Sequence, residues 1–211
     1  MCYNDNRGSC MKKSKVDDGY KHNTFLYVLI KPLILLVVKV VLNPKVIGKK
    51  NIPSDDGCII ACNHIHAFDP VILIYSSKRI VRFIAKSELF KGIFKSFFLS
   101  FGTIPVDRSK KNPLAVGLAE EYLNEGKVIG IFPEGTRNKS EEILLPFKYG
   151  AVRMAKETGK KIVPCALSGS YKFFRSTIKV VYGEAIDISD MELEDANELL
   201  REKIILLLEE K

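Results

Sequence analysis

Between residues 45 and 210, short apolar runs of strand length alternate with longer segments of helical pattern. This alternation is typical of a largely parallel or mixed sheet that is covered by helices on both faces. We therefore predict a single α/β domain over residues 44–211. The predicted strands are 45–52, 58–62, 81–85, 104–106, 127–132, 162–167 and 177–182, and the predicted helices are 70–77, 87–100, 113–125, 149–158 and 192–210.

Charge is distributed unevenly along the chain. The 211 residues carry a formal net charge of +8, and residues 1–50 hold ten Lys or Arg against three Asp or Glu. A basic amino-terminal segment next to an apolar one indicates an anionic membrane surface as a partner. The sequence has no basic run interleaved with aromatic residues, so we expect no nucleic-acid partner.

Two segments precede the predicted domain. Residues 1–21 are polar, basic and without periodicity, and we expect them to form a flexible tail. We expect residues 22–43 to form a hydrophobic helix, because Lys31 and Lys39 are the only charges from 25 to 42. A helix of that stretch measures about 27 Å, just short of a bilayer core, and a central lysine costs about 2.5 to 3.5 kcal/mol on insertion. This favours a helix lying in the membrane interface, with a spanning helix and a soluble core helix as alternatives.

A histidine and a carboxylate lie five positions apart where a strand is expected to end. The segment 63–70 (NHIHAFDP) follows strand 58–62, and Asp69-Pro70 is typical of a helix N-cap with proline at the first helical position. Loops at the carboxyl ends of strands collect ligands in α/β folds. A histidine bonded to Asp69 has a fixed tautomer and can act as a general base, so His64 is the candidate base. In the alternative interpretation, Asp69 only caps the helix and His64 is an ordinary loop residue.

Two basic side chains follow predicted strands closely. Arg108 ends the segment 101–108 (FGTIPVDR), where its guanidinium can donate two parallel hydrogen bonds to a phosphate. Lys86 follows strand 81–85 and can serve the same anion. For Arg108 the alternative is a solvated arginine at a strand end.

The segment 131–137 (IFPEGTR) combines a turn, a carboxylate and a guanidinium after an apolar strand. We expect the turn to expose Glu134 at the rim of the sheet, where it accepts a hydrogen bond from a substrate hydroxyl, while Arg137 binds an anion. Lys148 lies near the start of a predicted helix, an unusual place for a cation unless a bound anion lies nearby. The alternative is a plain proline-glycine turn with charged neighbours.

The five cysteines, without a recognisable cleavable signal peptide, indicate reduced thiols in a cytoplasmic setting. Cys58, Cys62, His64 and His66 would share one face of an extended strand, which suggests a zinc site. An extended strand spreads such side chains roughly 6 to 14 Å apart, so we expect no metal. A covalent route would need a triad serine or a reactive cysteine, and Cys62 is the only thiol close to the motif in the sequence. We disfavour this route, because a general base requires no acyl-enzyme.

Four ordered blocks, at residues 63–69, 102–108, 132–137 and 162–165, resemble those of the glycerolipid acyltransferases. The resemblance covers about residues 45–185 and is nearest to the bacterial 1-acylglycerol-3-phosphate acyltransferases. It implies a mixed-sheet α/β domain, often with an amino-terminal membrane-associating helical segment. Cys165 stands where many members have an apolar residue, which affects no catalytic position.

The resemblance also implies an activity. A fatty acyl group would pass from acyl carrier protein or coenzyme A to the sn-2 hydroxyl of lysophosphatidic acid, at the cytoplasmic face of the cell membrane and without a cofactor. Glycerol 3-phosphate or another lysophospholipid is an alternative acceptor, and a membrane-bound lipid-binding protein is the non-enzyme alternative. The family's base and its partner fall on His64 and Asp69, and its acceptor-binding positions fall on Arg108, Glu134, Gly135 and Arg137, with Lys86 and Lys148 added.

Overall fold

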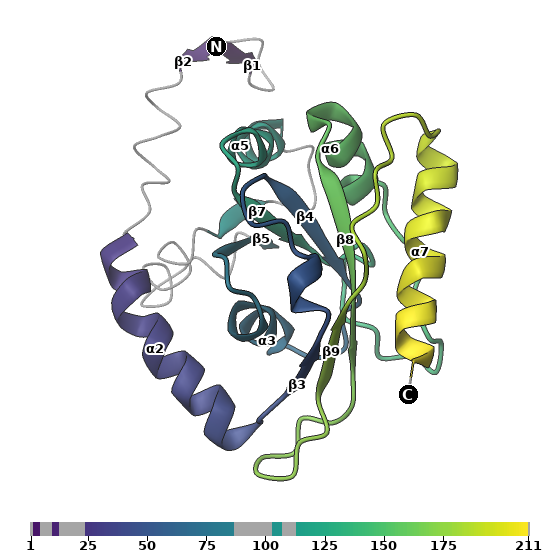
Figure 1. Cartoon of the computed structure of the whole chain (residues 1–211). Helices are drawn as coiled ribbons and strands as arrows, with labels where there is room; N and C mark the ends of the chain where they lie inside the picture. Colours follow the sequence, from purple (N-terminus) through teal and green to yellow (C-terminus); the bar gives the residue numbers. More distant parts are fainter. Residues whose placement is uncertain (1, 5–9, 13–23, 87–102, 107–112, 211) are drawn as a thin grey trace.

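The computed structural model describes residues 2–4, 10–12, 24–86, 103–106 and 113–210 (Figure 1). Its main sheet contains β3 (Lys45–Ile47), β4 (Cys58–Cys62), β5 (Val81–Lys86), β6 (Ile104–Val106), β7 (Val128–Ile131), β8 (Lys161–Ser168) and β9 (Lys179–Tyr182). The seven strands lie in the order β3-β9-β8-β4-β7-β5-β6. Every neighbouring pair is parallel except β8 and β9, which are antiparallel. The predicted mixed, largely parallel sheet is confirmed.

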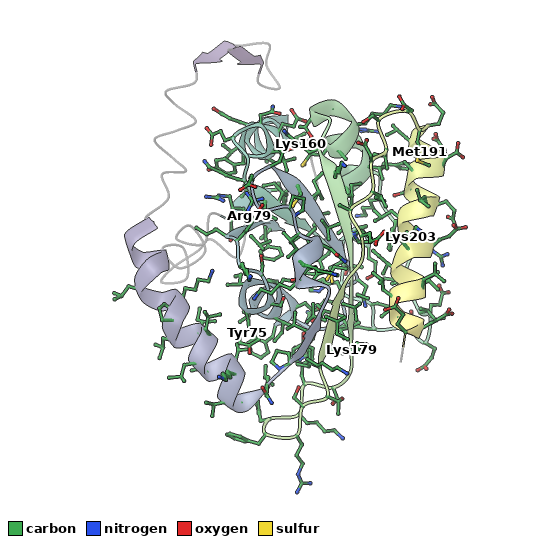
Figure 2. The ribbon with its side chains drawn as sticks, viewed as in Figure 1. Tyr75, Arg79, Lys160, Lys179, Met191 and Lys203 are labelled. Atoms are coloured by element: carbon green, nitrogen blue, oxygen red, sulfur yellow. The ribbon has the colours of Figure 1, made fainter. Side chains whose placement is uncertain are left out.

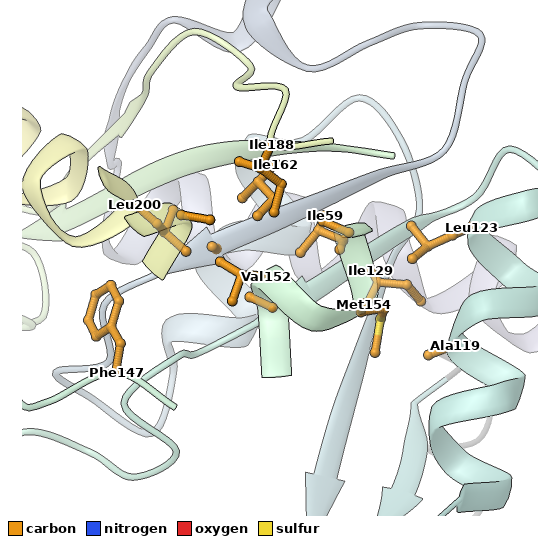
Figure 3. Packing of buried hydrophobic residues seen from close by; sticks show 14 of the residues in the cluster. Ile59, Ala119, Leu123, Ile129, Phe147, Val152, Met154, Ile162, Ile188 and Leu200 are labelled. Carbon is orange, nitrogen blue, oxygen red and sulfur yellow. The ribbon is translucent and has the colours of Figure 1, made fainter. Parts of the chain in front are cut away.

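Helices cover both faces of this sheet (Figure 1). They are α2 (Thr24–Val41), α3 (Asp69–Ser76), α5 (Pro113–Asn124), α6 (Gly150–Thr158) and α7 (Leu193–Glu209). Successive strand residues point to opposite faces, so β4 supplies both cores. Cys58, Ile60 and Cys62 pack with α2 and α3, whereas Ile59 and Ala61 pack with α5, α6 and α7. Figure 3 shows the second of these cores, where strand residues meet side chains of the three helices.

The central position of β4 determines where the loops emerge. It pairs in parallel with β7 on one side and with β8 on the other, so that Ala61 lies opposite both Ile131 and Pro164. The carboxyl ends of these strands therefore meet at the same edge of the sheet. The loop that follows β4 and the loop that follows β7 are neighbours at that edge.

Two parts of the chain differ from the sequence prediction. The predicted strand 45–52 ends at Ile47, because Gly48 turns into the left-handed region with φ 70° and a short 3-10 helix, η1 (Lys49–Asn51), follows. A Cβ at Gly48 would lie 2.0 Å from the carbonyl oxygen of Tyr182, so only glycine fits this turn. Within the predicted tail, β1 (Cys2–Asn4) and β2 (Cys10–Lys12) form an unpredicted antiparallel pair. The predicted helix 87–100 lies outside the described residues.

Helix α2 has two different faces. Val38 is buried and packs in the core with α3, while Leu33, Leu36 and Val40 on the outer side are each about 60% exposed. Figure 2 shows side chains of α2 extending away from the domain on the side opposite α3. Among the helices that the structure describes, none is both long and apolar enough to cross a membrane.

Candidate active site

His64 and Asp69 form a hydrogen-bonded pair at the carboxyl end of β4. The Nδ1 atom of His64 lies 2.7 Å from Oδ2 of Asp69. The Asp69 side chain is fully buried, and that of His64 is 17% exposed. Because Nδ1 is occupied by the carboxylate, Nε2 is the ring nitrogen left to exchange a proton with a bound molecule. The predicted pairing is present in the structure.

Asp69 is held by donors from the loop before it. The backbone N–H groups of Ile65 and His66 donate to Oδ2 at 2.7 and 2.8 Å. The predicted N-cap role of Asp69 is wrong: Phe68 occupies the N-cap position, and Asp69 is the first residue of α3. Its carboxylate therefore turns back to the loop instead of capping the helix amides ahead of it. The helix N-terminus and the loop donors together stabilise its negative charge.

Tyr171, for which no sequence motif predicts a role, completes the surroundings of Asp69. Its hydroxyl donates to Oδ1 of Asp69, and its ring stacks on His66 with centroids 4.1 Å apart. Burial raises the pKa of Tyr171 far above its usual range, and the neighbouring Asp69 charge raises it further. The phenol therefore stays protonated and acts as a donor. Its position just after β8 was the only signal in the sequence, because Asp69 is 102 residues away.

Glu134 is buried, in contrast to the prediction that the turn would expose it. Only 3% of the residue is exposed. Its Oε1 accepts a hydrogen bond from the backbone N–H of His64 at 2.7 Å, and its Oε2 accepts one from the backbone N–H of Leu145 at 2.9 Å. A carboxylate between two loops takes both donors because their N–H groups would otherwise be buried without a partner. Glu134 therefore positions His64, and its oxygens already have partners.

The loop after β7 also holds the ring and the carbonyl of His64. The Phe132 ring stacks on the imidazole with centroids 4.1 Å apart and 20° between the ring planes. The backbone N–H of Asn138 donates to the His64 carbonyl at 2.7 Å. Together with Glu134, one segment contacts the histidine at its ring, its N–H and its C=O. Such contacts fix the orientation of a catalytic base.

Asn63, just before the histidine, links β4 to the end of β8. Its side-chain amide donates to the Leu167 carbonyl at 2.9 Å and accepts from the Leu167 N–H at 2.7 Å. Asn63 is 2% exposed, so both bonds are shielded from water. This pairing starts the loop at a fixed point, one residue before His64.

The cysteines near the site are buried in the core. Burial raises the pKa of Cys62 well above its ordinary value, and Cys165 beside it raises it further. A buried thiol of this kind is a poor nucleophile. Within the described part of the chain, no group of three or more His, Cys, Asp or Glu side chains is arranged to hold a metal ion. These findings favour neither the covalent route nor the zinc site.

A cavity of about 350 Å³ adjoins His64 and runs between the sheet and two helices. Its apolar wall comes from β5, β6, β7, α5 and α6, and its charged lining residues are Lys148, Arg153 and the acidic Glu157. The lining residues are His64, Ile84, Val106, Val116, Ile131, Phe132, Gly135, Lys148, Gly150, Arg153, Met154 and Glu157. An apolar cavity with a base and cations suits a ligand that has both an apolar and an anionic part.

The predicted anion-binding residues are distributed differently around this cavity. Lys148 and Gly135 both line it, and a Cβ at Gly135 would lie 2.8 Å from Nζ of Lys148. Gly135 therefore makes room for the Lys148 side chain. Arg137 is exposed and is not a lining residue. Arg108 and the side chain of Lys86 lie outside the described residues. Arg153, one turn into α6, lines the cavity and was missed because no motif surrounds it.

Comparison with known proteins gives consistent results. The family model described as Acyltransferase matches residues 43–168. A 1-acyl-sn-glycerol-3-phosphate acyltransferase of Bacillus subtilis is 35% identical over 156 residues, which cover 69% of this chain and 75% of that protein. The enzyme of the same name from Borreliella burgdorferi is 34% identical over 178 residues, covering 78% and 71%.

A solved structure resembles the whole fold. The crystal structure of the 1-acyl-sn-glycerophosphate acyltransferase PlsC from Thermotoga maritima superposes with a TM-score of 0.70, covering 94% of this chain and 88% of that one at 21% identity. The family model spans β4, the His64–Asp69 pair and the loop after β7. From the matched family model and the two bacterial relatives, the chain is a member of the acyltransferase family, as the ordered sequence blocks predicted.

Proposed function

We propose that this protein transfers a fatty acyl group from an acyl thioester to the sn-2 hydroxyl of 1-acylglycerol 3-phosphate, giving phosphatidic acid for phospholipid synthesis. The observation that carries the proposal is the buried Asp69 bonded to His64 beside an apolar cavity with cationic lining residues. The two bacterial relatives, both 1-acyl-sn-glycerol-3-phosphate acyltransferases, support this choice of acceptor.

In this mechanism His64 acts as a general base. Its Nε2 takes the proton of the acceptor hydroxyl while the oxygen attacks the thioester carbonyl. The new C–O bond forms, the C–S bond breaks, and the proton passes from the imidazolium to the departing thiolate. Asp69 stabilises the imidazolium and keeps the ring in the productive tautomer. No acyl-enzyme intermediate is needed.

The two substrates have different requirements that the cavity can meet. We assign the acyl chain to the apolar wall formed by β5, β6, α5 and α6, and the acceptor phosphate to the end that Lys148 lines. Arg108, Arg137 and Lys86 complete the proposed phosphate set. Cations near a phosphate form charge-assisted hydrogen bonds, which are stronger than neutral ones. Gly135 contributes by leaving space for Lys148.

Either thioester donor suits the charge of the protein. Residues 51–187 carry a net charge of +6. Acyl carrier protein is acidic and coenzyme A carries phosphates, so both would be attracted to this segment. Because the lipid acceptor resides in bilayers, we place the protein peripherally at the cytoplasmic face of the cell membrane, with α2 and the basic segment before it in the interface.

An acyl-transfer assay with a panel of substrates tests the proposal. Lysophosphatidic acid, glycerol 3-phosphate and a neutral lysophospholipid are each paired with two donors, acyl-coenzyme A and acyl carrier protein loaded with an acyl thioester. The His64→Ala variant serves as control. We expect the highest kcat/KM with lysophosphatidic acid and no turnover by the control. Preference for glycerol 3-phosphate would reassign the acceptor. Lipid binding without turnover in every pairing would favour a lipid-binding protein.

A further inference from the structure

The connection between β8 and β9 carries two consecutive exposed phenylalanines. Phe173 is 64% exposed and Phe174 is 75% exposed. This loop extends past the ends of the two strands (Figure 1). Two adjacent aromatic rings facing water leave a large apolar area unburied, which is typical of an interaction site.

The conformation of this loop is defined. Phe174 adopts φ 59°, in the left-handed region that aromatic residues seldom occupy. Its backbone N–H donates to the carbonyl of Val41, the last residue of α2, at 2.8 Å. The contact holds the loop against the end of the helix and keeps the aromatic ring outside.

The loop and α2 line one groove. An open groove of about 660 Å³ is lined by both elements, with Leu36 and Val40 from the helix and Phe174 from the loop. Leu33, Leu36 and Val40 are each about as exposed as Phe173. We call the exposed faces of α2 and of Phe173 and Phe174 the apolar rim.

Basic side chains flank the apolar rim. Lys172 and Arg175 lie directly on either side of the two phenylalanines, and Lys39 lines the groove beside them. All three are exposed. Neither α2 nor the loop 169–178 contains an acidic residue. Apolar side chains flanked by cations match the interface of an anionic bilayer, whose headgroups attract the charges while the rings enter the acyl layer.

We propose that the β8–β9 loop inserts Phe173 and Phe174 into an anionic bilayer, beside the outer face of α2, as a second docking element built into the catalytic domain. A second copy of this chain is a poorer occupant, because a symmetric contact would bring like charges together. The inference rests on the proposed function only for its choice of a membrane as partner.

Insertion would take place close to the catalytic pair. Tyr171, two residues before Phe173, donates to Asp69 through its hydroxyl. A bilayer that holds the loop therefore also holds the donor that orients the carboxylate. Docking and the alignment of His64 would thus share one short segment of chain.

A single tryptophan gives a direct test, because the chain contains none. In the full chain, Phe173→Trp should show a blue-shifted emission when vesicles of phosphatidylcholine and phosphatidylglycerol are added, and brominated lipids should quench it. Ile143→Trp, at an exposed apolar residue on another loop, is the matched control and should not shift. If the Phe173→Trp protein cosediments with vesicles while its emission stays unchanged, the loop remains in water and the proposal is wrong.

Cosedimentation measures how much the loop contributes. The double variant Phe173→Gln/Phe174→Asn should bind anionic vesicles on the order of tenfold or more weakly, because two buried aromatic side chains are lost. Asparagine suits the left-handed backbone, and Phe173→Gln alone provides a second variant if the pair does not fold. The control Ile143→Gln/Leu206→Gln removes two other exposed apolar side chains and should bind normally.

The salt dependence of vesicle binding distinguishes the contribution of the basic side chains from that of the apolar rim. Lys172→Gln/Arg175→Gln should weaken binding to anionic vesicles at low salt and have little effect at high salt or on neutral vesicles. Binding is measured without substrate, so a protein that docks through the loop but transfers no acyl group would overturn only the proposed function. The proposed docking element is wrong if the folded phenylalanine variants bind vesicles as well as the wild type does. It is also wrong if these variants change the oligomeric state of the protein and leave vesicle binding unchanged.

Discussion

The backbone N–H of His64 donates to Oε1 of Glu134 at 2.7 Å, which links the loop after β4 to the loop after β7. The other oxygen of Glu134 accepts from Leu145 farther along the loop after β7, so the carboxylate both ties this loop to His64 and closes it on itself. The glutamate of the segment 132–137 (FPEGTR) thus holds the backbone of the proposed base in place. Its substitution should lower kcat more than it changes substrate binding.

We expect Glu134→Gln to lower kcat on the order of 10²-fold, since an amide nitrogen cannot accept the hydrogen bond that one carboxylate oxygen now takes and a small displacement of a catalytic group is costly. The KM for the acceptor should change little. Steady-state kinetics with each substrate varied in turn checks this. A raised acceptor KM with normal kcat would instead indicate that Glu134 contacts the substrate.

His64→Ala should abolish nearly all acyl transfer while the protein stays folded, because the side chain supplies the proton acceptor at the proposed reaction centre. Asp69→Asn should lose on the order of 10² to 10⁴-fold in kcat. His66→Ala is the neighbouring control. It should lower kcat only slightly, since His66 contacts Asp69 through its backbone N–H alone. Normal turnover in a folded His64→Ala protein would contradict the mechanism.

Tyr171→Phe should act on the base indirectly, as a positioning residue does. The variant keeps the ring that stacks on His66 and removes only the hydroxyl that donates to Asp69. The carboxylate then stabilises the imidazolium more strongly, so the acid limb of the kcat/KM profile should move to higher pH. A fall in kcat with an unmoved profile would mean that the hydroxyl has a structural role alone.

The sequence was sufficient for features that depend on local spacing. Alternating apolar runs predicted the described helices, and every strand of the main sheet except the first, to within a few residues. The five-residue interval placed His64 against Asp69. Glu134 was misassigned because its partners are backbone N–H groups of residues 64 and 145, which no side-chain pattern reports. Tyr171 reaches Asp69 only through the placement of β8 beside β4, a long-range pairing that local spacing does not encode.

Lys148→Gln should raise the KM for the acceptor with a smaller change in kcat, because a phosphate contact contributes to ground-state and transition-state binding alike. A lost charge-assisted hydrogen bond of about 1.5 to 3 kcal/mol corresponds to roughly a 10- to 150-fold change. Arg137→Ala and Arg108→Ala should act in the same sense. Lys139→Gln, an exposed lysine beyond the 132–137 sequence block, is the matched control. If the donor KM moved and the acceptor KM did not, the phosphate site would have to be reassigned.

Glu120 on α5 and Glu157 on α6 make the stability of the protein depend on pH. Burial, and then the neighbouring Glu157 carboxylate, raise the pKa of Glu120 from its ordinary value of 4.5 to about 7. Between these two values the folded protein binds a proton more tightly than the unfolded chain does, so this pair contributes a loss of stability as the pH rises from 4.5 to about 7.

Glu120→Gln removes the titrating group and should lessen the fall in Tm between about pH 5 and about pH 8. Thermal unfolding of the wild type, of Glu120→Gln and of Glu202→Gln, an exposed control on α7, measures the difference, because every other titrating group contributes equally to the three curves. Parallel Tm profiles for all three proteins would show that the pKa of Glu120 is not raised in the folded state.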